Sequence, residues 1–480
     1  MTTREQSAKR KTKSMSDKTL KSVHITNYYH KNSGGISTAY NELLKAANRH
    51  RRYARLIVPG AKDEIEEVGE YGRIYYVKAD FSPLFDRRYR LMLPWKTYIF
   101  NNAPIRRILR EKRADIIEIG EKYTLSLLGG LIRKGFFKSL GRPLVVHYTC
   151  ERMDDNLRAF VSGAKPFRWF ARRVMGNYIF PMFDYHLANS QYTAQELIDA
   201  VSPEKNPRRS ELLFKFCWQF FKSLPSAAAA EKVFVNNCGV DGETFTVKRK
   251  SAETRRKILI EAGFPENATV LLYAGRISPE KNVKLLPKVL HSLLKFRNYD
   301  SQKREYRLLV AGDGPQKDGL GKELERRAAG KHKILGHIVD REKLADIYAN
   351  SDIFIHPNPR EPFGIAPLEA MASGTPVVAP NSGGLLSFAT DENAWLGEPE
   401  VEDYFAAVRD IFNDDERRER KVKNALLTAR NYTWENSTDR LFEIYSRMYA
   451  NFQGQKSLPA ATNEVEKPGC AINNIKTLKP

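Results

Sequence analysis

The sequence of 480 residues has few cysteines and lacks long apolar runs. Its four cysteines, Cys150, Cys217, Cys238 and Cys470, are far apart and form no CxxC pair. This spacing argues against a zinc site or a disulfide framework and favours a reducing compartment. No stretch of about twenty apolar residues could span a bilayer, and the basic, polar N-terminus has no apolar core typical of a secretory signal. We therefore expect a cytoplasmic protein.

Acidic residues are scarce relative to basic ones. There are 57 Asp and Glu residues against 79 Lys and Arg residues, which gives a formal net charge of +22. Such an excess points to nucleic acid, an anionic membrane surface or phosphorylated substrates as partners. A soluble protein with a basic surface is the plainer alternative, so charge alone does not select a function.

Short apolar runs alternate with helical patterns along most of the chain. In the first half such runs begin near Ser22, Arg55, Arg73, Asp115, Leu144 and Tyr185, and the pattern restarts at Ala268. The alternation is typical of parallel, doubly wound sheets. It predicts an α/β protein with two Rossmann-like domains, and the cleft between such domains is the usual place for a ligand.

Three loops at the carboxyl ends of predicted strands carry candidate ligand-binding residues. "GGIS" begins at Gly34, where glycine lets the backbone approach a ligand closely. "AGRISPEKN" holds Arg276 and Lys281, which together could neutralise a diphosphate without a metal. In "AGDGPQKDGLG" the third glycine is misplaced for a dinucleotide fingerprint, so Gly312–Pro315 is predicted to be a tight turn near a ligand.

The fourth such loop is "PREPFGIAPLEAMASG", which begins at Pro359. Glu361 precedes the turn and Glu369 lies in the first turns of the predicted helix. Backbone N–H groups near Gly364, Ile365 and Ala366 could bind an anion, because a helix N-terminus favours negative charge. Carboxylates beside that anion would accept hydrogen bonds from sugar and ribose hydroxyls. The alternative is that they complement the helix dipole, for which one glutamate would be enough.

These motifs resemble those of retaining glycosyltransferases with the GT-B fold, family 4, also called glycosyl transferases group 1. "EPFGIAPLEAMASGTPVVAPNSGG" is similar to the family's pattern of two glutamates separated by seven residues. "ANSQYTAQEL", "NNCGVDGETF", "LADIYANSDIFIHPN" and "YTWENSTDRLFEIY" follow in family order, so the resemblance runs from about Lys21 to Tyr449. Cys238 interrupts the motif "NNCGVDGETF", which is the family's linker motif. The insertion after Ala200 is a second departure from the family pattern.

The resemblance implies a role for each candidate residue. Arg276 and Lys281 would hold the donor diphosphate, Glu369 the ribose and Glu361 the transferred sugar, while His147 would lie near the reacting sugar. From its own pattern, His147 could equally be a buried strand histidine. The implied catalytic set is Glu361, His147, Arg276 and Lys281. The implied donor-binding set is Gly34, Gly35, Arg276, Lys281, Gly336, Ile338, Glu361, Phe363, Gly364, Ile365, Ala366 and Glu369.

The predicted function is that of a retaining, metal-independent hexosyltransferase. It would move a sugar from a UDP- or GDP-linked donor to a lipid-linked acceptor or a cell-envelope glycan, with no cofactor. The backbone near Gly336–Val339 would read the base. A non-catalytic nucleotide-sugar-binding protein and a GT-B phosphorylase or epimerase are the alternatives. Nucleic acid is not an expected partner, because it would leave the cleft motifs without a purpose.

Four segments of the N-terminal half mix Lys or Arg with large aromatic residues. They are "RRYRLMLPWK", "APIRRILREKR", "KPFRWFARRVMGNYIFPMF" and "RRSELLFKFCWQFFKSL". Aromatic rings sit at the headgroup level of a membrane while cations meet anionic lipid. The segments therefore predict peripheral contact with the inner face of an anionic membrane.

The predicted organisation has five parts. They are a flexible basic tail (1–20), an N-terminal acceptor-side domain (21–245) with an aromatic and basic insertion at about 202–231, a C-terminal domain that binds the nucleotide sugar (246–434), a helix that packs back toward the N-terminal domain (435–453) and a disordered tail (454–480).

Overall fold

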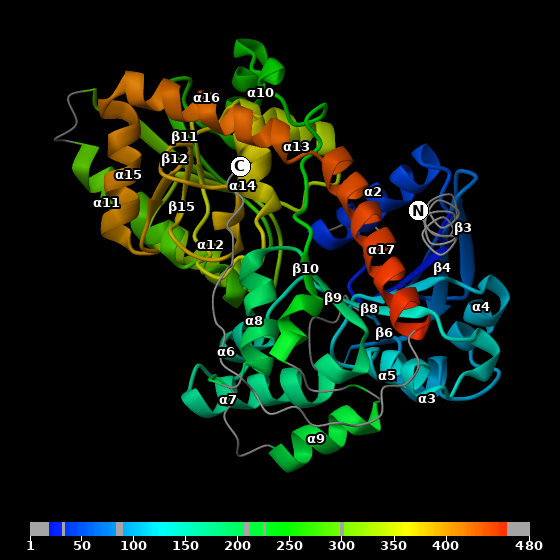
Figure 1. Ribbon diagram of the computed structural model, residues 1–480. Coiled ribbons are helices and arrows are strands. Elements are labelled where there is room, and N and C mark those ends of the chain that lie inside the picture. Colours follow the sequence, from blue (N-terminus) through cyan, green and yellow to red (C-terminus); the bar gives the residue numbers. More distant parts are fainter. Residues whose placement is uncertain are drawn as a thin grey trace, which may run out of the picture.

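The structure is a computed structural model that describes residues 19–30, 34–82, 90–202, 204–205, 211–221, 223, 227–297 and 302–457. The N-terminal domain is an α/β unit (Figure 1). Its main elements are β1 (Ser22–Ile25), α2 (Gly35–Arg49), β2 (Ala54–Gly60), β3 (Glu64–Val68), β4 (Gly72–Lys78), β5 (Asp80–Phe81), β6 (Arg90–Leu91), α3 (Pro94–Thr97), α4 (Pro104–Lys112), β7 (Ile116–Ile119), α5 (Ser126–Lys134), β8 (Leu144–Thr149), α6 (Met153–Phe160), α7 (Lys165–Val174), β9 (Tyr185–Ala188), α8 (Gln191–Val201), α9 (Glu211–Phe220) and β10 (Val233–Val235).

The C-terminal domain is a second α/β unit, followed by one long helix. Its elements are α10 (Ala252–Ala262), β11 (Ala268–Ala274), α11 (Leu285–Phe296), β12 (Glu305–Ala311), α12 (Lys317–Ala328), β13 (His332–Gly336), α13 (Arg341–Ala349), β14 (Ile353–Ile355), α14 (Ile365–Ala372), β15 (Val377–Pro380), β16 (Trp395–Gly397), α15 (Val401–Asn413), α16 (Asp415–Asn431) and the long helix α17 (Trp434–Ser457).

Each domain is built on one parallel sheet. The strand orders are β10-β9-β8-β7-β1-β2-β4-β3 and β13-β12-β11-β14-β15-β16. Apart from the small β5–β6 pair, the only antiparallel pairing among the described strands joins β3 to β4 at the edge of the first sheet. Central strands such as β11 are buried along their whole length, as expected where helices cover both faces. The doubly wound architecture predicted from the apolar runs is therefore correct.

Helix α17 connects the two domains. Its first residue, Trp434, belongs to a hydrophobic core of the C-terminal domain, whereas Phe442, Tyr445 and Met448 pack into the core of the N-terminal domain. The Tyr445 hydroxyl also donates a hydrogen bond to the buried Glu118 carboxylate of β7. Figure 1 shows the helix running from one domain onto the other.

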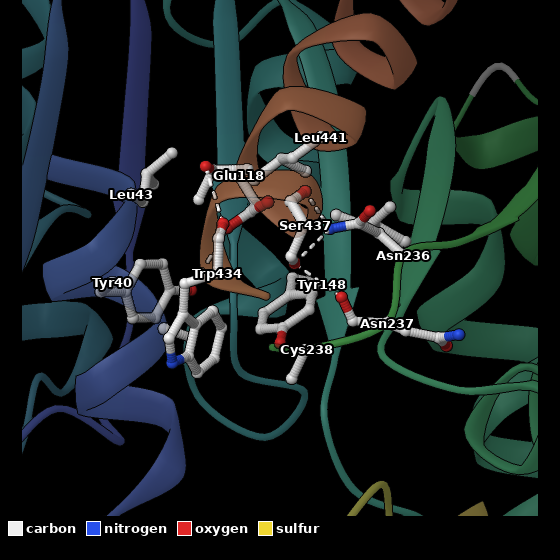
Figure 2. Close-up of a pocket in the computed structure, with 13 residues that line it drawn as sticks. Tyr40, Leu43, Glu118, Tyr148, Asn236, Asn237, Cys238, Trp434, Ser437 and Leu441 are labelled. Carbon is white, nitrogen blue, oxygen red and sulfur yellow. Dashed lines mark hydrogen bonds between the residues drawn. The ribbon is translucent and has the colours of Figure 1, made fainter. Parts of the chain in front are cut away.

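A small cavity of about 40 Å³ lies where α17 meets α2 and the linker between the domains. Figure 2 shows Tyr40, Glu118, Tyr148 and Trp434 around it. None of its lining residues belongs to the predicted donor-binding set. The cavity is therefore a packing gap at the domain junction and is distinct from the predicted donor site.

Both predicted tails begin or end at the wrong residue. Leu20 is buried in the N-terminal core, so the ordered domain begins before residue 21. Helix α17 continues to Ser457, so the chain is still helical at residue 454. The rest of the two tails, residues 1–18 and 458–480, lies outside the described residues.

Part of the predicted insertion at 202–231 is helical. Helix α9 is anchored by Trp218, whose indole N–H donates to the carbonyl oxygen of Gly176 at 3.0 Å and whose ring stacks on Phe180. Residues 203, 206–210, 222 and 224–226 lie outside the described residues. Among the helices that are described, none has the length and apolar character needed to cross a membrane.

Candidate active site

The loops that follow β11 and β12 pack directly on each other. The Ile277 N–H donates to the Asp313 carbonyl at 2.9 Å, and the Gln316 N–H donates to the Ile277 carbonyl at 3.0 Å. A β-carbon at Gly312 would collide with the carbonyl oxygen of Gly275, so no larger residue fits there. The "AGDGP" segment is thus a tight turn that supports the loop of Arg276, as its glycine pattern predicts.

Two helix N-termini face each other across the domain boundary. Helix α2 begins after Gly34 and helix α14 begins after Gly364; both glycines have positive φ angles, 93° and 103°, and neither helix has a side-chain cap. A β-carbon at Gly35 would lie 2.7 Å from the Ile365 side chain, so the two ends are in contact. Together they offer uncapped N–H groups and two partial positive charges to an anion.

Glu361 and Lys281, predicted to bind different parts of a donor, are paired with each other. Lys281 Nζ lies 2.7 Å from Glu361 Oε2, which also accepts a hydrogen bond from Asn358 Nδ2 at 2.8 Å. Burial alone would raise the pKa of Glu361, but Lys281 and the nearby His356 outweigh it, so this pKa lies well below its usual range. Glu361 is therefore ionised at neutral pH.

Glu369 has a different environment, although it lies only eight residues further along the motif. It is half-buried on α14 and accepts a hydrogen bond from the Tyr348 hydroxyl at 3.1 Å. Burial raises its pKa to about 7, and the attraction of Arg341 only partly offsets this effect. The two motif carboxylates thus have pKa values displaced in opposite directions, which is common for groups with separate roles in a site.

A glycine-rich loop after β15 holds the Glu361 turn in place. The Gly384 N–H donates to the Glu361 carbonyl at 2.6 Å, and a β-carbon at Gly384 would collide with the backbone of Pro362. The Ser382 hydroxyl donates to the Pro359 carbonyl at 3.0 Å. In the sequence these residues stand out only as part of the family motif, with no role of their own.

The same turn also contacts the N-terminal domain. The Ser190 hydroxyl, which caps α8, donates to the Pro362 carbonyl at 2.5 Å. Arg360 Nε lies 3.6 Å from Asp155 Oδ1 on α6, and the Tyr192 hydroxyl donates to the other oxygen of Asp155. The Glu361 loop is therefore held from both domains.

Two predicted site residues have buried side chains in this structure. His147 is 0% exposed; its Nδ1 lies 3.2 Å from His186 Nδ1, and its ring packs on Phe183. Burial holds its pKa well below the ordinary value, so His147 is neutral and its ring is enclosed in this structure. The Phe363 side chain is also buried, against Phe388 and Tyr432, so only its backbone could contact a donor.

The remaining predicted donor-binding residues lie at the carboxyl ends of neighbouring strands. Arg276 is half-buried in the loop after β11, and Gly336 at the end of β13 pairs with Gly312. Ile338 packs against the C-terminal core, and Ala366 is half-buried in the first turn of α14. The strand ends thus bring together the segments that the resemblance assigned to the base, the diphosphate and the sugar.

The C-terminal domain, which holds most of this arrangement, resembles a known protein family. The model of the family Glycosyl transferases group 1 matches residues 254–427, a range that contains Arg276, Lys281, Glu361 and Glu369. Over these residues the chain is similar to the group 1 glycosyltransferases. The family resemblance inferred from the motifs is therefore confirmed.

Two relatives illustrate the extent of the similarity. The chain is 32% identical over 220 residues to sulfoquinovosyl transferase SQD2 of Arabidopsis thaliana, a match that covers 45% of this chain and 40% of that protein. It is 26% identical over 433 residues to the GDP-mannose-dependent alpha-(1-6)-phosphatidylinositol dimannoside mannosyltransferase of Mycobacterium tuberculosis, covering 89% of this chain and 97% of that protein. The chain thus spans less than half of the first relative but nearly all of the second.

Solved structures identify the fold. Alr3699/HepE of Anabaena, in complex with UDP and glucose, superposes with a TM-score of 0.62 at 17% identity, covering 89% of this chain and all of that one. At this identity the match shows the fold alone. The fold of this chain is GT-B, with two Rossmann-like domains, as the sequence predicts.

Proposed function

We propose that the protein is a retaining, metal-independent glycosyltransferase that moves a sugar from a nucleotide diphosphate sugar to a lipid-linked acceptor or a cell-envelope glycan. The observation that carries this proposal is the Lys281–Glu361 pair. Glu361 lies on a loop that contacts both domains, close to two uncapped helix N-termini. A site that binds a diphosphate and a sugar needs a cation and N–H groups for the diphosphate and a carboxylate for the sugar hydroxyls.

The proposed chemistry is stabilisation of the departing nucleoside diphosphate. Negative charge grows on the diphosphate as the glycosidic bond breaks, and preorganised donors that face that charge lower the barrier. Arg276, Lys281 and the N-termini of α2 and α14 would supply the positive field without a metal ion. Retention of configuration is proposed from the resemblance of the Glu361–Glu369 motif to retaining enzymes, with the acceptor attacking from the face that the diphosphate leaves.

The donor is proposed to be UDP- or GDP-linked. The mycobacterial relative is named for GDP-mannose, and the Anabaena structure contains UDP. Residues 336–338 would read the base through backbone groups, and half-buried Glu369 would accept hydrogen bonds from the ribose hydroxyls. Backbone contacts are compatible with either base, so both donors belong in the first assay.

Transfer assays with radiolabelled nucleotide sugars test this function directly. We expect incorporation of label into a lipid extract or an envelope glycan from one UDP- or GDP-sugar, and we expect EDTA to leave the rate unchanged. A matched reaction with Mg²⁺ added after EDTA controls for slow metal loss. Label that is never transferred or released would contradict the glycosyltransferase proposal, whereas activity that EDTA abolishes and Mg²⁺ restores would contradict metal independence.

We also propose that the protein docks peripherally on the inner face of an anionic membrane. In Figure 1, helices α3, α5, α7 and α9 lie along the end of the N-terminal domain that is remote from the C-terminal domain. The exposed aromatic surface consists of Trp95, Phe100, Phe136, Phe160, Trp169, Phe170, Phe216 and Phe220, located on or next to these helices and α6.

Cations accompany the rings of this exposed aromatic surface. Arg173 lies over the Trp169 ring at 4.2 Å, and Lys134 lies over the Phe220 ring at 4.3 Å. Trp169 is 56% exposed and Phe216 is 63% exposed. Rings at the headgroup level and cations next to anionic lipid together support reversible docking. Each basic residue near the membrane surface contributes about 1 kcal/mol to binding.

Vesicle sedimentation tests the docking proposal. We expect binding to rise with the anionic lipid content of the vesicles and to fall at high salt, because salt screens the charges. Trp169→Ala with Phe216→Ala should weaken binding several-fold, since two exposed rings are lost. Ile260→Ala, at a 66% exposed position on α10 of the C-terminal domain, is the matched control and should bind like the wild type. Wild-type protein that stays in the supernatant at every lipid composition would instead favour a soluble acceptor.

A further inference from the structure

His356 is a buried residue of the Glu361 site with no role predicted from the sequence. It follows β14 directly and is 4% exposed. Its backbone is fixed from two sides, because its N–H donates to Val378 at 2.9 Å and its carbonyl accepts from the Tyr404 hydroxyl at 2.7 Å. Its ring lies nearly parallel to that of Phe354. Backbone and ring are therefore both restrained.

The His356 ring faces Glu361. Its Nε2 lies 3.3 Å from Glu361 Oε2, the same oxygen that is paired with Lys281 and Asn358. Neither ring nitrogen has a hydrogen-bond partner within the part of the chain that the structure describes. Burying an imidazole without a hydrogen-bond partner costs free energy, so such a group in a native structure calls for an explanation.

Lys281 has two possible anionic partners in the proposed reaction. In this structure it pairs with Glu361, and in the donor-bound enzyme it would face the diphosphate. When Lys281 turns toward the diphosphate, Glu361 loses its nearest cation while it remains largely buried. A buried carboxylate without a partner tends to take up a proton, and a protonated Glu361 would orient the sugar hydroxyls differently.

We infer that His356 is a positioning residue that hydrogen-bonds Glu361 through Nε2 once Lys281 has turned to the donor diphosphate. The inference rests on the proposed function, since it requires a diphosphate to attract Lys281. A neutral imidazole with its proton on Nε2 is sufficient to donate this hydrogen bond. Glu361 then stays ionised and oriented toward the sugar. The groups that face Glu361 are Lys281 from the loop after β11, His356 and Asn358 after β14, and Tyr273 of β11.

Two substitutions of His356 separate positioning from simple packing. His356→Gln keeps an N–H donor near the position of Nε2, whereas His356→Leu removes it at similar volume. We expect His356→Leu to lower kcat about 10–100-fold, the usual effect of losing a group that orients another. The donor KM and the dissociation constant of the free nucleoside diphosphate should change little. His356→Gln should recover most of kcat.

The pH profile gives a second measurement that a packing role would not move. Without its His356 partner, the ionised form of Glu361 is less stabilised in the loaded enzyme, so its pKa rises. The acid limb of kcat against pH should therefore shift to higher pH in His356→Leu and return in His356→Gln. His291→Leu, which removes a half-buried histidine of α11 that hydrogen-bonds the Arg327 carbonyl of α12, is the control and should keep the wild-type profile.

The possible outcomes are distinct. If the wild type is active and His356→Leu has the same kcat and pH profile as the wild type, the inference is overturned and the proposed function is left intact. Equal losses in the Gln and Leu variants, accompanied by a lower Tm in both, would assign His356 to packing and also overturn it. A wild type that turns over no nucleotide sugar would overturn the proposed function, and the inference with it.

Discussion

Alanine at Arg276 or at Lys281 is expected to lower the rate of sugar transfer about 10²–10³-fold. Each side chain is proposed to face the diphosphate, and its interaction strengthens as negative charge develops on the leaving group. The loss should therefore appear mainly in kcat. Initial rates with the preferred nucleotide sugar measure the effect. Lys284→Ala is the matched control, because Lys284 is an exposed cation three residues beyond Lys281 and should be dispensable.

The two alanine variants should differ in stability and pH response. Arg276→Ala is expected to leave thermal unfolding almost unchanged. Lys281→Ala leaves the Glu361 carboxylate, whose side chain is only 12% exposed, without its cation, and an unpaired buried charge is destabilising. The Tm should fall in Lys281→Ala and recover when Glu361→Gln is added. A double variant, Arg276→Ala with Lys281→Ala, that still transfers sugar at nearly the wild-type rate would show that this loop does not bind the diphosphate.

The sequence was sufficient to predict the fold because the fold depends on repeated local patterns. Alternating apolar runs and helices predicted both parallel sheets, and the strand-end loops placed Arg276, Lys281, Glu361 and Glu369 in one domain. Strand β3 was not predicted, because its sequence EIEEV is largely exposed at the sheet edge and carries almost no apolar signal. Short edge strands of this kind depend on a neighbouring strand more than on their own composition.

The features of the site that the sequence could not predict concern the direction of side chains. His147 lies on a central parallel strand, which is buried on both faces, so periodicity could not show which way the ring points. Phe363 lies in a motif of donor-binding residues, yet its ring fills the C-terminal core. The Lys281–Glu361 and His356–Glu361 contacts join residues 80 and 5 positions apart, and no single-chain pattern encodes such pairings. These features could be identified only from the structure.

Replacing each motif glutamate by glutamine should produce two different kinetic losses. Glu361→Gln is expected to depress kcat, because the transferred sugar loses a charged acceptor for its hydroxyls while the nucleotide contacts remain. Glu369→Gln is expected to weaken binding of the free nucleoside diphosphate, because the ribose loses its acceptor. Hydrogen bonds to a charged partner are the stronger class, so each loss should be about tenfold or more. Calorimetry with nucleoside diphosphate and steady-state kinetics distinguish the two.

The pH dependence of nucleoside diphosphate binding gives the sharpest test of the Glu369 assignment. Burial raises the pKa of Glu369 to about 7 in the unliganded protein, so the carboxylate is substantially protonated below that pH. Hydrogen bonds from ribose hydroxyls favour the ionised form and lower its pKa in the complex. Binding therefore releases a proton at low pH, and affinity should rise from pH about 6 to about 8, then level off above the free-state pKa.

The glutamine variant separates this effect from ionisation of the ligand itself. The terminal phosphate of a nucleoside diphosphate also titrates in this range and affects wild type and variant alike. The pH dependence that remains in Glu369→Gln therefore reports the ligand, and the difference from wild type reports Glu369. Glu361 should contribute nothing in this window, because its pKa lies well below its ordinary range. Parallel pH curves for wild type and Glu369→Gln, or equal losses of affinity in the two glutamine variants, would show that Glu369 does not bind the ribose.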